Sequence, residues 1–297
     1  MGGRKLSSHH LHRRPDQATH ARDTLPLYHI SEIPEWMADN KYILHGYRAG
    51  YTMKMCVRSL FSLHNETMNV WTHLLGFLFF AAFGVAMFLY VLSPVWLHYF
   101  IFGLMSVSCM ACLCCSTVFH LFSAHYNESV CRRLHSLDYF GITCLVIGSF
   151  VPMCFLAFAC EPSLKWMYLT MIFVLGFVGL VGPFYSFWTT PEFKTYKMLV
   201  YTFMVGSGVF PIIHVNFIMP VSSSAPFATG MALELLLYLT GMLIYIFKAP
   251  ERFFPGRFDV WFHSHQVWHV FVLLAAMVHF FTVAGMYLHW EHMEQHC

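Results

Sequence analysis

The sequence predicts an all-α membrane protein with seven transmembrane helices, a cytoplasmic N-terminus and an extracellular C-terminus. Hydrophobic residues make up 58% of the 297 residues and charged residues only 11%, whereas a soluble domain carries about 25% charged residues. A soluble core of this size would need a charged surface that the chain does not have. The composition therefore indicates an integral membrane protein, and we expect no nucleic-acid partner.

Seven apolar runs reach the roughly 20 residues that a membrane-spanning helix needs. They cover about 69–92, 98–123, 137–159, 166–188, 197–219, 227–248 and 264–289. Gly182-Pro183 in the fourth run and Gly208 to Pro211 in the fifth predict kinks, because glycine and proline interrupt the helical hydrogen bonds.

The flanks of these runs complete the expected domain organisation. Residues 1–24 are polar and rich in histidine, which is typical of a disordered cytoplasmic tail. They contain no apolar stretch of the kind found in a cleavable signal peptide. Residues 25–68 are more apolar and predict a membrane-surface segment with a short amphipathic helix near 54–63. The seven-helix domain spans 69–289, and 290–297 form an extracellular tail.

The orientation follows from the distribution of lysine and arginine, which collect in cytoplasmic connections. Nine lie in the N-terminal segment and seven in later connections on the same side, and Lys165 is the only one on the other side. The first side is therefore predicted to be cytoplasmic. The glycosylation sequons at Asn65 and Asn127 fall on this side, so we expect neither to be modified.

Two histidines at the start of the last run carry the strongest chemical signal. His265 and His269 lie four residues apart, which places both rings on one face of a helix. The second run ends near His120, the third begins near Asp138, and the alternation of the spans brings both to the same end of the bundle as the histidine pair. Ser116 lies one turn deeper on the same face as His120.

Three imidazoles with an open fourth position are typical of a catalytic zinc site. Asp138 is then a fourth ligand, an orienting partner or the base that holds a water molecule, and Ser116 is placed to hydrogen-bond a carbonyl oxygen. The apolar surroundings favour a lipid ester or amide as the substrate. The alternatives are a structural polar network, Asp138 as a helix cap, and His73 as a competing ligand.

The remaining polar signals are weaker. His214 and His279 are expected to hydrogen-bond neighbouring helices. The ten cysteines show no metal-ligand spacing. Cys154 and Cys160, near the predicted outer side, are candidates to form a disulfide together or to join one with another cysteine.

Several long motifs carry a resemblance that runs from about residue 33 to residue 286. They are HNETMNVWTHLLG at 64–76, STVFH at 116–120, LDY at 137–139 with GSFVP at 148–152, PERFFPG at 250–256 and SHQVWH at 264–269. In these stretches the chain resembles the progestin and adiponectin receptor family and, within it, the adiponectin receptors.

The resemblance implies a zinc ion held by His120, His265 and His269, with Asp138 beside the reacting water and Ser116 as the associated serine. It also implies a plasma-membrane receptor for a secreted hormone that acts on lipid and glucose metabolism through a cytosolic adaptor. Such receptors are similar to ceramidases, which hydrolyse ceramide to a sphingoid base and a fatty acid. The alternatives are a receptor or scaffold whose zinc is only structural, and a Golgi location; the sequence leaves homo-oligomerisation open.

Overall fold

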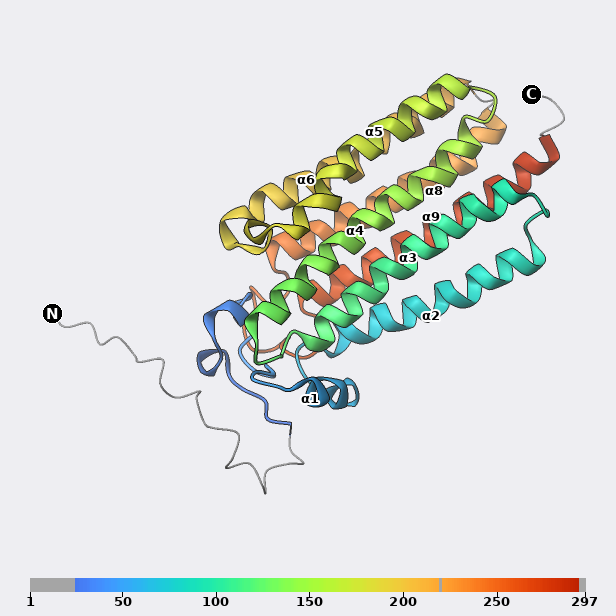
Figure 1. Cartoon of the computed structure of the whole chain (residues 1–297). Helices are drawn as coiled ribbons and strands as arrows, with labels where there is room; N and C mark the ends of the chain where they lie inside the picture. The colour runs from blue at the N-terminus through green and yellow to red at the C-terminus, as the bar shows by residue number, and fades with distance from the viewer. Residues whose placement is uncertain (1–24, 219–220, 294–297) are drawn as a thin grey trace.

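The computed structural model describes residues 25–218 and 221–293, and within them seven helical stretches are long and apolar enough to cross a membrane. The fifth stretch is built from two helices. The helices run side by side in one bundle, with the N-terminal segment and α1 at one end (Figure 1). In chain order they are α2 (Thr67–Tyr90), α3 (Trp96–Phe122), α4 (Glu128–Ala157), α5 (Pro162–Val181), α6 (Lys194–Gly206) with α7 (Val209–Ile218), α8 (Val221–Phe247) and α9 (Ser264–Met293).

The third span begins at Glu128, nine residues before the start predicted from hydropathy. Its first turns are polar and extend beyond the apolar run. Asn127 caps the helix by accepting a hydrogen bond from the Ser129 amide at 2.9 Å. The Arg132 side chain pairs with Glu128 one turn away. Asp138 therefore lies well inside α4, and its interpretation as a helix cap is wrong.

Both predicted irregularities lie where the glycines and prolines indicate. The α-helical part of the fourth span ends at Val181, and Gly182–Phe184 continue as one turn of 3-10 helix. The fifth span is divided at Ser207 and Gly208 into α6 and α7. These breaks confirm that the two spans are not continuous α-helices.

The segment before α2 folds against one end of the bundle. Its described part contains three short 3-10 turns and α1 (Met53–Arg58), and α1 overlaps the stretch where a short amphipathic helix was expected. The Asn40 amide donates to Glu251 at 3.0 Å, and the backbone amides of Leu44 and His45 donate to Asp259 at 2.9 Å. The segment is thereby attached to the α8–α9 connection.

The two terminal tails are only partly described. Residues 1–24, predicted as a disordered tail, lie outside the described residues. The predicted tail at 290–297 is helical as far as Met293, and its last four residues also lie outside the described residues.

Glycines allow α3 and α4 to pack closely. A Cβ atom at Gly141 would lie 2.9 Å from the Cys112 Cα, and one at Gly148 would overlap the Ser108 side chain. This close approach brings the end of α3 and the first half of α4 together, with His120 and Ser116 on one and Asp138 on the other.

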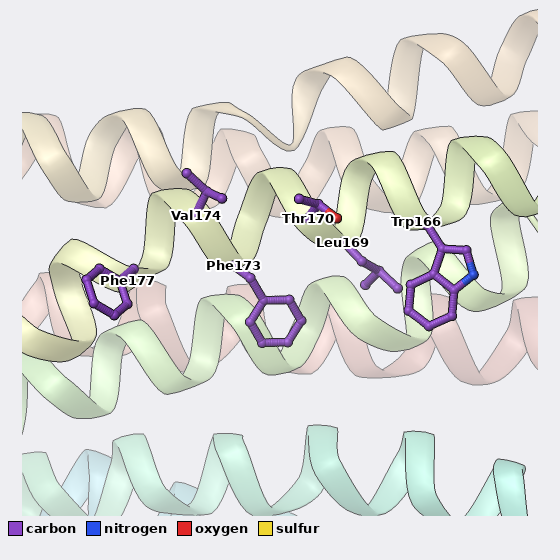
Figure 2. Close-up of a pocket in the computed structure, with 6 residues that line it drawn as sticks. All are labelled: Trp166, Leu169, Thr170, Phe173, Val174 and Phe177. Atoms are coloured by element: carbon purple, nitrogen blue, oxygen red, sulfur yellow. The ribbon is translucent and has the colours of Figure 1, made fainter.

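The outward face of α5 carries a shallow groove of about 450 Å³ (Figure 2). Its lining is apolar apart from Thr170, and it includes aromatic side chains that are at least half exposed, such as Trp166 and Phe173. A bilayer would cover such a surface with lipid chains. The groove offers no cluster of titratable groups, and the chemistry lies elsewhere.

Candidate metal centre

Three histidines gather at the end of the bundle that contacts the N-terminal segment. His120 lies in the last turn of α3, and His265 and His269 lie in the first two turns of α9. One ring nitrogen from each lies within 4.8 Å of the others. The ring centroids of His120 are 5.0 Å from His265 and 4.6 Å from His269. The structure therefore brings together the three residues predicted as metal ligands.

Glu66, just before α2, orients the first of these rings. The His120 Nδ1 atom lies 2.7 Å from the Glu66 Oε2 atom, and the Asn69 amide donates to the same oxygen at 2.6 Å. Burial alone would raise the pKa of Glu66, but the neighbouring His120 ring holds this pKa well below its usual range. A carboxylate behind a histidine is the usual way to direct the other ring nitrogen toward a metal.

The first turn of α9 is held by the loop before α2. The His263 ring and the Gln266 amide both donate to the Asn65 carbonyl, at 2.9 and 3.0 Å. The Ser264 amide donates to Glu251 at 2.8 Å. Ser264 is the first residue of α9, and the first amides of a helix have no partners within it, so Glu251 supplies the missing partner. The contacts of His263 and Gln266 join the start of the helix to Asn65. The positions of His265 and His269 depend on this anchoring.

The end of α3 is held by a buried arginine from the N-terminal segment. The Arg48 guanidinium donates to the carbonyls of His120 and Leu121 at 2.7 and 3.0 Å, and to the Ser59 hydroxyl at 2.6 Å. The last carbonyls of a helix have no partner within the helix, and Arg48 supplies one. This contact positions the backbone that carries His120.

The donor set fits a zinc ion. The His120 Nε2 and His269 Nδ1 atoms are buried and have no hydrogen-bond partner within the described part of the chain. Buried polar atoms are rarely left unpaired. Since Glu66 holds the Nδ1 atom of His120, the Nε2 atom is the one free to bind a metal. Neutral imidazole nitrogens in a tetrahedral set are a preferred environment for zinc.

Asp138 and Ser116 form a second polar pair next to the histidines. The Ser116 hydroxyl donates a hydrogen bond to the Asp138 carboxylate, and His120 is near enough to interact with that carboxylate electrostatically. Asp138 is not among the residues that form the three-histidine group. Asp138 therefore lies next to the three histidines in this structure and is not grouped with them as a fourth ligand.

His73 belongs to the same region but is placed differently. Its ring is buried and stacks on His269 with centroids 3.9 Å apart. It lies outside the three-histidine group. The expectation that it ranks below His120 as a ligand agrees with this geometry.

Several other side chains resolve open questions from the sequence. The His214 ring bonds the Tyr168 hydroxyl at 2.9 Å, and His279 bonds Glu234 at 2.8 Å, which confirms contacts between helices. Cys154 is a free buried thiol, whereas Cys160 is disulfide-bonded. The two cysteines are therefore not bonded to each other, and of the two only Cys160 joins a disulfide.

The sequence reasoning missed three residues that contact the candidate site, namely Glu66, Arg48 and Asn65. The signal for Glu66 was its place in the HNETMN motif, directly before the first span. Nothing in the spacing of that motif indicated contact with a histidine 54 residues later.

The fold and this site define a class, a seven-helix membrane protein with a candidate metal centre inside one end of its bundle. The family model for haemolysin-III related proteins matches residues 61–280, and the chain belongs to that family. Its relatives there include progestin and adipoQ receptors and adiponectin receptors.

Three relatives show the extent of the similarity. The Arabidopsis thaliana heptahelical transmembrane protein 1 is 36% identical over 274 residues, which cover 88% of this chain and 80% of the relative. The adiponectin receptor protein of Drosophila melanogaster is 34% identical over 264 residues, or 87% of this chain. The mouse progestin and adipoQ receptor family member 3 is 33% identical, over 88% of this chain and 86% of the relative. The match spans only 59% of the Drosophila protein.

Proposed function

We propose that this chain is an adiponectin-receptor-like membrane receptor whose zinc site hydrolyses a ceramide-like amide lipid to a sphingoid base and a fatty acid. The observation that carries the proposal is the placement of Asp138 and Ser116 beside the cluster of His120, His265 and His269. A metal that only stabilised the fold would not need this adjacent acid.

The chain's own residues have distinct roles in such a reaction. A zinc ion held by the three histidines would supply a Lewis acid that polarises a carbonyl oxygen or activates water. Asp138 accepts the proton of the attacking water and later delivers it to the leaving amine nitrogen. Ser116 orients the Asp138 carboxylate, and Glu66 keeps the His120 ring turned toward the ligand set. The surrounding apolar helices admit the lipid chains and exclude bulk water.

The receptor part of the proposal rests on the relatives. One of them is named an adiponectin receptor, so we propose a secreted hormone as the ligand on the outer face. A cytosolic adaptor would bind the N-terminal segment, and the plasma membrane is the proposed location, with the Golgi as the alternative. The N-terminus is placed in the cytoplasm because lysine and arginine collect on that side.

The test combines metal content with product analysis on the detergent-purified chain. Wild type should hold one zinc per chain and release fatty acid from ceramide. Asp138→Ala should keep its zinc but lose hydrolysis by roughly 10²–10⁴-fold, the usual contribution of a general acid–base group.

His265→Ala should lose zinc and stability together, because two neighbouring imidazoles are left without a partner. His214→Ala, outside the site, is the control.

The alternative function is a receptor or scaffold with a purely structural zinc. Its supporting observation is the completeness of the three-histidine set, which can bind a metal without turnover. Stoichiometric zinc with no release of fatty acid, in protein that still binds its hormone, would establish this alternative.

A further inference from the structure

A second buried polar site lies further along the bundle, away from the three histidines. The His279 Nδ1 atom on α9 lies 2.8 Å from the Glu234 Oε2 atom on α8, and the two side chains are only 6% and 13% exposed. His279 follows His269 by ten residues, which corresponds to about 15 Å along a helix. An ionisable pair at this depth in a membrane is costly unless its charge is compensated.

The hydrogen bonds determine how many protons the pair holds. The second nitrogen of His279, Nε2, lies 3.1 Å from the Ser149 carbonyl oxygen. A carbonyl only accepts, so this nitrogen carries a hydrogen. The Nδ1 and Oε2 atoms also need one proton between them, because two lone pairs at 2.8 Å would repel. The pair therefore shares one proton and has no net charge, either as carboxylate and imidazolium or as carboxylic acid and imidazole.

A small cavity gives this pair a route for further proton exchange. It measures about 30 Å³ and lies between α4, α6, α7, α8 and α9, with Glu234, Tyr238 and His279 in its wall. One water molecule needs about 10–15 Å³ of such space. Glu234 and Tyr238 both line this cavity with polar side chains. Both are therefore available to water in the cavity.

Few other titratable groups face the pair. α8 contributes Tyr238, and α3 contributes the buried Cys109 thiol, which is close enough to interact electrostatically with Glu234. The part of α4 that lines the cavity contributes Ser149 and apolar side chains, and α6 and α7 contribute apolar residues with Gly208 between them. No lysine or arginine lines the cavity.

We propose that Glu234 and His279 form a proton-binding site in the membrane interior, separate from the three-histidine cluster and supplied by water beside Tyr238. Uptake of one proton from solution converts the neutral pair into a carboxylic acid and an imidazolium with one positive charge. The added proton goes to the Glu234 Oε1 atom, which lies away from His279, and the Oε2 atom still accepts from the Nδ1–H group of the imidazolium. Because that oxygen no longer carries a negative charge, the contact between α8 and α9 becomes weaker. On either side of the pair these helices pack closely, through Gly230 against Thr282 and Gly241 against Phe271.

The experiment is infrared difference spectroscopy of the full chain in lipid nanodiscs, recorded between pairs of pH values in H₂O and D₂O. Wild type should show a carboxylic-acid carbonyl band that depends on pH and shifts in D₂O. Glu234→Gln keeps a hydrogen bond to His279 but cannot titrate, so the band should disappear. Glu192→Gln, which changes an exposed glutamate, should retain it.

Two further measurements make the outcome decisive. His279→Gln should shift the midpoint of the band by about one pH unit or more, because the histidine then no longer shares the proton. Zinc content should be unchanged in Glu234→Gln, which separates this site from the metal centre. A wild-type band that persists in Glu234→Gln, the lack of any Glu234-dependent band, or an unchanged midpoint in His279→Gln would overturn the proposal.

Discussion

The position of the candidate metal ligand His120 depends on the hydrogen-bond partners around it. Its ring Nδ1 atom is hydrogen-bonded to Glu66, and its backbone carbonyl accepts a hydrogen bond from Arg48. Both partners come from the chain before the first span. A carboxylate and an arginine therefore position the ring. Neither the spacing of residues in the sequence nor the hydropathy pattern indicates these two contacts.

Glu66→Gln is expected to weaken zinc binding about 10–100-fold, the usual effect of losing a charged partner behind a metal-binding histidine. The glutamine still accepts a hydrogen bond but no longer supplies a negative charge to the ring. Competition with a chelator measures the affinity, and Glu192→Gln serves as the exposed control. Equal affinity in the two variants would show that Glu66 does not support the ligand set.

His64 is expected to make the protein less stable in acid. Its ring is buried, with the Nε2 atom 3.1 Å from the Ser59 carbonyl and the Nδ1 atom accepting from the Glu66 amide. Burial, with the nearby Arg48, lowers the pKa of His64 to about 3. An unfolded histidine titrates near pH 6.5. Below that value the unfolded chain binds a proton that the folded chain does not, so stability falls as the pH drops from about 6.5 toward 3.

Thermal unfolding at a series of pH values tests this dependence. The contribution of His64 is at most about 1.4 kcal/mol per pH unit within that window, and it vanishes above the window. His64→Gln should flatten the profile relative to wild type. An unchanged slope in the variant would assign the acid sensitivity to other groups.

At the scale of the helices, close packing of α3 on α4 determines the geometry of the site. Gly141→Val is expected to separate these helices, because its Cβ would lie 2.9 Å from the Cys112 Cα. We expect a stability loss of about 1–3 kcal/mol from overpacking, together with lower hydrolysis as Ser116 and Asp138 move apart. Unfolding and product release are measured on the same preparation.

Gly285→Val in α9 is the matched control, since nothing lies within 4 Å of a Cβ at that position. If both valine variants lose stability equally, the effect comes from the intrinsic cost of a β-branched residue in a helix and not from the α3–α4 contact.

The start of α4 shows why helix ends are difficult to predict in a membrane protein. Hydropathy detects only the apolar part of a helix, and the polar turns from Glu128 onward extend outside that part. The cap at Asn127 is the local signal that marks the true start. For the same reason Asp138, which is near the apolar boundary in sequence, is well inside the helix in the structure.

At the scale of the whole molecule, the orientation in the membrane is open to a direct test. Asn65 and Asn127 should remain unglycosylated when the chain is expressed in cells, because both lie on the predicted cytoplasmic side. Digestion with a glycosidase should leave the electrophoretic mobility unchanged, and an N-terminal epitope should be labelled only after permeabilisation. A glycan on either asparagine would reverse the proposed orientation.

Much of this protein could be predicted from its residues alone. Seven spans, the irregularities near Gly182 and Gly208, and the grouping of His120 with His265 and His269 were all predicted correctly. This is possible because a membrane requires long apolar helices. Successive helices cross it in opposite directions, so the sequence tells which helix ends lie on the same side of the membrane. Residue type and helical spacing were then sufficient to identify the ligand set.

Contacts between distant parts of the chain could not be predicted in this way. Four contacts join residues that no local periodicity connects. They are Glu66 with His120, Arg48 with the end of α3, Asn65 with the start of α9, and Glu234 with His279. Such contacts depend on which helices are neighbours and on their rotation, and these are set by packing of small residues such as Gly141 and Gly148. The apolar pattern and the helical spacing therefore determined where the helices lie in the chain and which histidines group together. The partners that orient these histidines depend on tertiary packing.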